Sequence, residues 1–101
     1  MMKVLFVCKW NRFRSKIAEG YFNEMMLGSK HKVKSAGFIY NLAIGEETVK
    51  TINKGGISLV DLDTRGLDYD LLDDRSYMST WSTPYDYIEY IEKDTDTSLL
   101  H

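Results

Sequence analysis

The feature that most restricts the fold is an apolar segment, a polar loop and an amphipathic helix in succession at the start of the chain. In Lys3–Val7 the apolar side chains do not alternate with polar ones, which is typical of a strand buried on both faces of a parallel sheet. From Ser15 to Leu27 apolar side chains recur at helical spacing, and Gly28 suits a C-terminal cap. Because helices cover the faces of parallel sheets, this order predicts an α/β fold.

The rest of the chain continues the alternation. Three further segments have the spacing of regular structure: a strand at His31–Ala36, a helix at Glu46–Lys54 and a third strand at Ser76–Trp81. Pro84 suits the start of another helix, and Thr95–Leu100 predicts either an edge strand or a disordered tail. With 101 residues the chain is long enough for one core. We therefore expect a single domain over residues 1–101, a three-layer sandwich around a parallel sheet.

Composition excludes several classes of function. The net charge is −2, so there is no basic surplus for binding nucleic acid. No apolar run is long enough to span a membrane, which predicts a cytoplasmic protein. His31 and His101 lack the spacing of metal ligands, so neither a metal nor another cofactor is expected. The single cysteine, Cys8, can form no internal disulfide and acts either in packing or as a nucleophile.

The loop between the first strand and the first helix favours the nucleophile. It consists of Cys8, Lys9, Trp10, Asn11, Arg12, Phe13, Arg14 and Ser15. Five residues between a Cys and an Arg can curl so that their backbone N–H groups converge above the sulfur, and the following helix adds its positive end. These groups would stabilise a thiolate that attacks phosphorus.

Three polar side chains of the loop have expected roles in this chemistry. Arg14 can bind two oxygens of a phosphoryl group at once, which a lysine cannot do. Ser15 can donate to the sulfur and ease its departure from a phosphocysteine intermediate. Asn11 tolerates left-handed backbone and can hold the curl of the loop. The loop therefore predicts a site for a tetrahedral oxyanion such as inorganic phosphate.

These residues resemble the low-molecular-weight protein tyrosine phosphatase family, which includes thioredoxin-linked arsenate reductases. The matching positions are Val4–Cys8, Asn11, Arg14–Ser15, Ile17–Glu19 and Ser35–Gly37, with a weaker match from Gly45 to Ile57. The resemblance implies a four-stranded parallel sheet, possibly reduced here, with helices on both faces. It also implies hydrolysis of phosphotyrosyl proteins or small aryl phosphates through a cysteinyl-phosphate intermediate.

The resemblance assigns roles to individual positions. Cys8, Arg14 and Ser15 correspond to the catalytic residues of the family, and Asn11 and Ser35 to its supporting hydrogen-bond network. An aromatic residue after the second strand stacks on the substrate ring in the family, and Phe38 or Tyr40 is the candidate here. The substrate is expected to meet the rest of the loop as well: Lys9, Trp10, Asn11, Arg12 and Phe13.

The chain departs from the family pattern at three places. Trp10 stands where the family generally has glycine, and it either narrows the pocket or forms its rim. Lys16 stands where the family has proline. No Asp-Pro pair is present to supply the general acid, for which Asp86 is the nearest candidate. In an alternative alignment Thr97–Leu100 is the fourth strand and the chain ends before the acid loop.

Four functions remain open at this stage. The first is hydrolysis of aryl phosphates, and the second is binding of phosphate or phosphopeptides with weak catalysis. Arsenate reduction would need an external thiol, because no second cysteine exists. A phosphocarrier shares the strand–Cys–loop–helix start but needs no loop arginine, so Arg14 counts against it.

Overall fold

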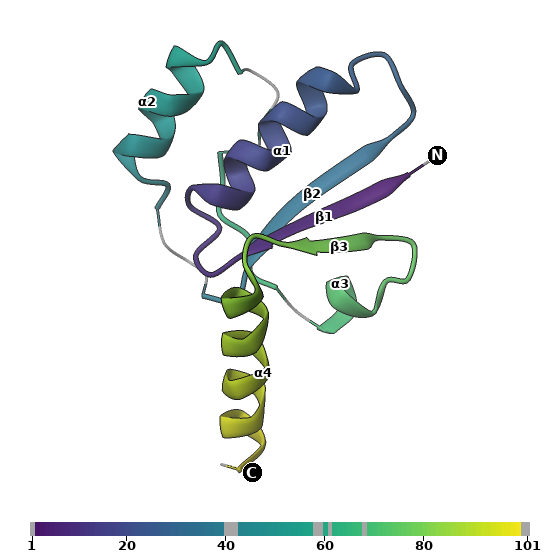
Figure 1. The fold of residues 1–101 in the computed structure, drawn as a ribbon, viewed down its shortest axis with the longest axis vertical. Coiled ribbons are helices and arrows are strands. Elements are labelled where there is room, and N and C mark those ends of the chain that lie inside the picture. The colour runs from purple at the N-terminus through teal and green to yellow at the C-terminus, as the bar shows by residue number, and fades with distance from the viewer. Residues whose placement is uncertain (1, 40–42, 58–59, 61, 68, 100–101) are drawn as a thin grey trace.

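Three parallel strands form the centre of the computed structural model, which describes residues 2–39, 43–57, 60, 62–67 and 69–99. The strands are β1 (Lys3–Cys8), β2 (Lys32–Gly37) and β3 (Met78–Trp81), in the order β2–β1–β3 (Figure 1). β1 is the central strand, and its side chains are buried or half-buried on both faces of the sheet, as the lack of alternation predicted. In this register Cys8, the last residue of β1, lies opposite Gly37.

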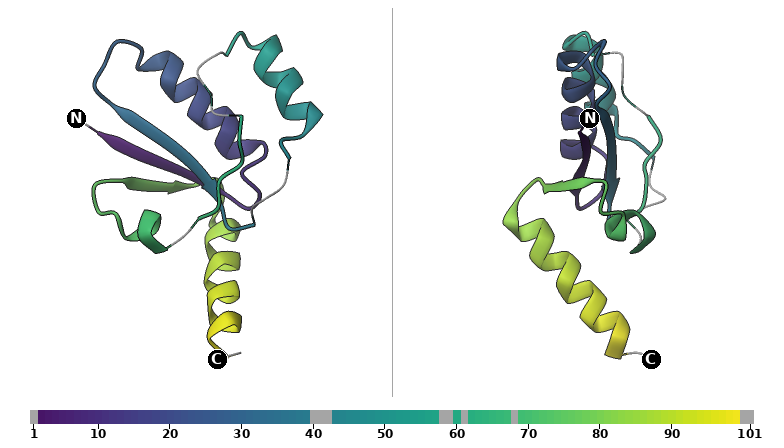
Figure 2. Two further views of the ribbon diagram at one scale, coloured as in Figure 1. Left: turned by 180° about the vertical axis from the view of Figure 1, so that it is seen from behind. Right: turned by 90° about the vertical axis from the view of Figure 1, so that its right-hand side faces the viewer.

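Helices lie on both faces of the sheet (Figure 2). The helices are α1 (Arg14–Met25), α2 (Glu46–Lys54), α3 (Tyr69–Asp73) and α4 (Pro84–Leu99). On one face α1 packs against β1 through an edge-to-face contact between Phe22 and Phe6, with ring centroids 6.0 Å apart. On the other face lies the main apolar cluster, made of Leu5, Val7, Ala36, Phe38 and Leu67 with side chains of α3 and Tyr90 of α4 around it.

The expected fold is confirmed in its class, its parallel sheet and the order of its first elements. The fourth strand is not found among the described residues, where Gly66 makes only an isolated parallel bridge to Gly37. The expectation of a strand or a disordered tail at Thr95–Leu100 is wrong as far as Leu99, because α4 continues to that residue. The segment is polar and acidic and has no alternating apolar residues, so it gives a strand no face to bury.

The last helix, α4, begins under the carboxyl ends of the strands and runs away from the sheet (Figures 1 and 2). Its first turns contact the body, where Trp81 of β3 packs against the rings of Tyr87 and Tyr90. This position brings the first two turns of α4 next to the Cys8 loop. Within the described residues no helix is long and apolar enough to cross a membrane.

Candidate active site

The Cys8 loop curls back over the sulfur of its first residue. Cys8 is buried, and the backbone N–H of Asn11 donates to its sulfur at 3.2 Å. Asn11 has a φ of 51°, the left-handed region, and is the only residue besides glycine with positive φ in the described part of the chain. The next helix, α1, starts without a side-chain cap and without an acidic residue in its first turn. Its positive end therefore faces the loop without an acidic residue of that turn to offset it.

A relay of hydrogen bonds fixes the hydroxyl beside the sulfur. The backbone N–H of Arg65 donates to Oδ1 of Asn11 at 2.6 Å, and this bond sets the orientation of the Asn11 amide. Nδ2 of Asn11 then donates to Oγ of Ser15 at 2.7 Å. Ser15 Oγ lies 3.0 Å from the Cys8 sulfur. Because a lone pair of Ser15 already accepts from Asn11, its hydroxyl proton is available to the sulfur.

Gly37 is required for the loop to lie this close to β2. A Cβ added at Gly37 would lie 2.5 Å from the backbone N of Asn11 and 2.7 Å from the carbonyl carbon of Trp10. Both are backbone atoms, so no side-chain rotation relieves the clash. Gly37 also bonds on both sides to the Arg65–Leu67 segment, at 2.8 and 2.7 Å. The lack of a side chain at Gly37, the last residue of β2, thus allows the Cys8 loop to adopt this position.

We expect Gly37→Ala to displace the loop and abolish phosphate binding, and to cost about 1–3 kcal/mol of stability as overpacked sites do. Calorimetric titration with phosphate and thermal unfolding measure the two effects. The control is Gly55→Ala at the end of α2, whose added Cβ would come no closer than 3.3 Å to any atom. Unchanged phosphate affinity in Gly37→Ala would contradict this account of the loop.

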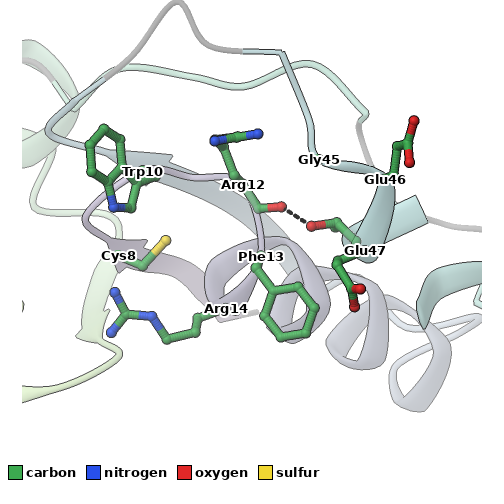
Figure 3. Close-up of a pocket in the computed structure, with 9 residues that line it drawn as sticks. Cys8, Trp10, Arg12, Phe13, Arg14, Gly45, Glu46 and Glu47 are labelled. Atoms are coloured by element: carbon green, nitrogen blue, oxygen red, sulfur yellow. Dashed lines mark hydrogen bonds between the residues drawn. The ribbon is translucent and has the colours of Figure 1, made fainter. Parts of the chain in front are cut away.

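A pocket of about 480 Å³ opens above Cys8 between the loop and the start of α2. Trp10 and Phe13 stand at its mouth, both about two-fifths exposed (Figure 3). Thr48 donates from Oγ1 to the carbonyl of Arg12, and Nε of Arg12 donates to the carbonyl of Ala43 at 2.8 Å. The complete lining is Cys8, Trp10, Arg12, Phe13, Arg14, Gly45, Glu46, Glu47 and Thr48.

Arg14 makes a two-point ion pair with Asp86 in the first turn of α4. Nη1 of Arg14 lies 2.6 Å from Oδ2 of Asp86, and Nη2 lies 3.0 Å from Oδ1. Asp86 is only 1% exposed, whereas the Arg14 side chain is 41% exposed. Thr83 donates from its hydroxyl to Oδ2 of Asp86 at 3.1 Å. The expected general acid is thus engaged with the loop arginine.

A second ion pair joins the loop to α4 one turn further along. Nζ of Lys9 lies 3.3 Å from Oε1 of Glu89 and 5.3 Å from the centroid of the Trp10 ring. Hydrogen bonding to Glu89 raises the pKa of Tyr85 above its ordinary value, and the charge of Glu89 adds to the shift. Lys9 is not among the residues that line the pocket, and its ion pair connects the loop to α4.

Several expected residues lie elsewhere. Ser35 is buried and donates to Oε1 of Glu19 at 2.5 Å rather than to Asn11. Phe38 does not line the pocket, because it is 5% exposed in the core and packs against the ring of Tyr90. Tyr40 lies outside the described residues.

Sequence reasoning missed four contributors to the site: Gly37, the backbone of Arg65, Thr83 and the start of α2. The Ser35–Gly37 motif contains a signal for the first of these, since a glycine that ends a strand can mark close approach of another backbone. Thr83 also has a local signal, because it stands three residues before Asp86 at the start of α4, the spacing of a capping box. Arg65 and the start of α2 come from distant segments and give no local signal. Across the described residues no group of three or more potential metal ligands occurs.

The fold and the loop together define an α/β protein whose loop curls around the sulfur of a buried cysteine at the end of the central strand. The chain belongs to the low molecular weight phosphotyrosine protein phosphatase family, whose model matches residues 3–80. Among curated proteins no sequence matches significantly.

Solved structures support the fold. The low molecular weight protein tyrosine phosphatase from T. tengcongensis is 29% identical, with a TM-score of 0.76 over 91% of this chain and 65% of its own. SP-PTP from Streptococcus pyogenes, another such phosphatase, has a TM-score of 0.79 at 18% identity and covers 94% of this chain and 65% of its own. YfkJ from Bacillus subtilis is 30% identical, with a TM-score of 0.75 over 86% of this chain and 58% of its own. The chain thus spans just under two thirds of the length of these relatives.

Proposed function

We propose that the chain hydrolyses phosphate monoesters of phenols, either phosphotyrosyl proteins or small aryl phosphates, with Cys8 as the nucleophile. The observation that carries the proposal is the Cys8 sulfur itself, which receives the Asn11 N–H at 3.2 Å and lies 3.0 Å from the Ser15 hydroxyl. Such donors stabilise a thiolate, the reactive form of cysteine. The family membership established by residues 3–80 supports the same chemistry.

The reaction proceeds in two displacements at phosphorus. The Cys8 thiolate forms the S–P bond while the bond from phosphorus to the phenolic oxygen breaks, and the phenolate takes a proton from water. Water then attacks the phosphocysteine, phosphate leaves, and the sulfur departs as a thiolate that Ser15 can stabilise by donating to it. Arg14 binds oxygens of the phosphoryl group through both steps.

The pocket favours an aromatic leaving group. Trp10 and Phe13 provide aromatic surface at the mouth, against which a phenyl ring can pack. The expected acid, Asp86, bonds to Arg14 with both oxygens instead of facing the pocket. With Asp86 engaged in this way, we expect the leaving oxygen to depart without a proton from Asp86, as an anion, and phenolates do so far more readily than alkoxides.

The test is a series of phosphate esters whose leaving groups differ in acidity. We expect kcat/KM to rise steeply with the acidity of the phenol. We also expect alkyl phosphates to react more slowly than phosphates of acidic phenols by at least the factor of about 10²–10⁴ that a general acid supplies. Release of phenol and of phosphate is followed separately. Equal rates for alkyl and aryl esters, or no turnover of either, would refute the proposal.

A second candidate is a phosphate- or phosphopeptide-binding module with little turnover, and the pairing of Asp86 with Arg14 favours it. Protection by phosphate against thermal unfolding, without turnover of the most acidic aryl ester, would identify this function. Arsenate reduction is a third candidate, since a thioredoxin-dependent arsenate reductase from Corynebacterium glutamicum shares the fold at a TM-score of 0.64 and 22% identity. It would appear as arsenate reduction that depends on an added small thiol.

A further inference from the structure

We infer that Asp86 is a positioning residue that orients Arg14 for the oxyanion, and that the start of α4 thereby completes the phosphate site. The inference rests on the proposed function for its kinetic part, but its binding part stands without turnover. It assigns a role to a helix that begins at Pro84, beyond residues 3–80 matched by the family model.

The geometry of the ion pair leaves room for a phosphoryl group. Asp86 meets the two terminal nitrogens of Arg14, with one oxygen on each, at 2.6 and 3.0 Å. This arrangement uses one N–H from each terminal nitrogen. A guanidinium has five N–H groups in one plane, so Nε–H and the outer N–H of the adjacent terminal nitrogen form a second edge for two oxygens. One carboxylate and one oxyanion can therefore bind Arg14 together.

Asp86 is fixed more firmly than the arginine that it holds. It is 1% exposed, it accepts from the Thr83 hydroxyl at 3.1 Å, and its own N–H donates to Thr83 Oγ1 at 3.2 Å. Arg14 is a long side chain, 41% exposed, which would otherwise sample many rotamers. A buried anchor that restricts those rotamers before the anion arrives lowers the cost of binding it.

The neighbouring ion pair supports the same arrangement. Glu89 lies three residues after Asp86 on α4 and pairs with Lys9 at 3.3 Å. Two successive turns of α4 therefore each make an ion pair with the Cys8 loop. Figure 3 places Arg14 and Arg12 on different sides of the Cys8 sulfur. Arg12 is held from the α2 side by the carbonyl of Ala43, and Arg14 from the α4 side by Asp86.

The experiment compares phosphate and vanadate affinity in Asp86→Ala, Asp86→Asn and Asp86→Glu, by calorimetric titration of the full chain. We expect affinity to fall about 10- to 100-fold in the alanine and asparagine variants, as a misplaced binding group would cause, and to recover in part in Asp86→Glu. The matched control is Glu92→Gln on the same helix, whose side chain is exposed and which should bind as the parent does. Thermal unfolding in the absence of anion shows whether each variant is folded.

Kinetics with acidic and weakly acidic aryl phosphates separate positioning from acid catalysis. Loss of positioning lowers kcat/KM by the same factor for both esters, so the dependence on leaving-group acidity is unchanged. A defect confined to the weakly acidic ester would identify Asp86 as the general acid and overturn the inference. Tighter oxyanion binding in folded Asp86→Ala would also overturn it, because Asp86 would then compete for Arg14. If the parent binds phosphate but turns over no ester, the proposed function fails, and the affinities of the variants still decide the role of Asp86.

Discussion

Cys8→Ser should remove hydrolysis of acidic aryl phosphates, with kcat falling roughly 10⁴- to 10⁶-fold, while phosphate still binds. A serine hydroxyl is not ionised at neutral pH, and the hydrogen-bond partners of the Cys8 sulfur, the Asn11 N–H and the Ser15 hydroxyl, are not general bases. The hydrogen-bond donors expected to bind phosphate in the Cys8 loop belong to other residues: the backbone of Asn11, the start of α1 and Arg14. The measurement pairs initial rates with the Kd for phosphate.

Two outcomes would count against this prediction. Retained turnover in Cys8→Ser would move the nucleophile elsewhere in the chain. Loss of phosphate binding in a folded Cys8→Ser variant would show that the sulfur itself determines the conformation of the Cys8 loop. In that case Cys8→Ala should lose phosphate binding as well.

Arg14→Lys should lower kcat/KM for the same ester by about 10²–10³-fold, the loss expected when one main donor to the transition state is removed. An ammonium group cannot bind two phosphoryl oxygens in one plane and cannot hold Asp86 with two parallel bonds at the same time. It still leaves a positive charge near the buried carboxylate. We therefore expect the fold to be retained.

Arg14→Ala measures how much the ion pair with Asp86 contributes to the stability of the fold. It leaves the 1% exposed Asp86 with Thr83 as its remaining side-chain partner among those described, which should cost about 1–3 kcal/mol of stability. The expected loss of stability is smaller than for a fully buried ion pair because the Arg14 side chain is 41% exposed. Arg12→Lys is the control, since Arg12 is held by the carbonyl of Ala43 and should lose less activity. Equal losses in Arg12→Lys and Arg14→Lys would contradict the assignment of Arg14 as the phosphoryl ligand.

The part of the site that could be predicted from the sequence is the part that is contiguous in it. Cys8, Asn11, Arg14 and Ser15 lie in one short loop, so local geometry and helix polarity are enough to relate them. The left-handed Asn11 follows from the same local reasoning and is confirmed at a φ of 51°. The start of α2 was expected as a helix but gave no indication that it would line the pocket.

The rest depends on tertiary contacts that a single sequence does not reveal. Arg65 reaches Asn11 through a backbone N–H, which no side-chain pattern records. Asp86 was chosen for its place near the only proline, and only the packing of α4 beneath the loop shows that it meets Arg14. The sequence of Thr95–Leu100 predicted either an edge strand or a disordered tail. In the structure α4, which begins at Pro84, continues to Leu99.

The most direct test of the account is to stop the reaction of an acidic aryl phosphate with acid within one turnover and to locate the phosphoryl group by peptide mass spectrometry. The account predicts one phosphoryl group on the peptide that contains Cys8, in an amount equal to the initial burst of phenol, and none in Cys8→Ser. Turnover without phosphorylation of Cys8, or with the phosphoryl group on another residue, would contradict it.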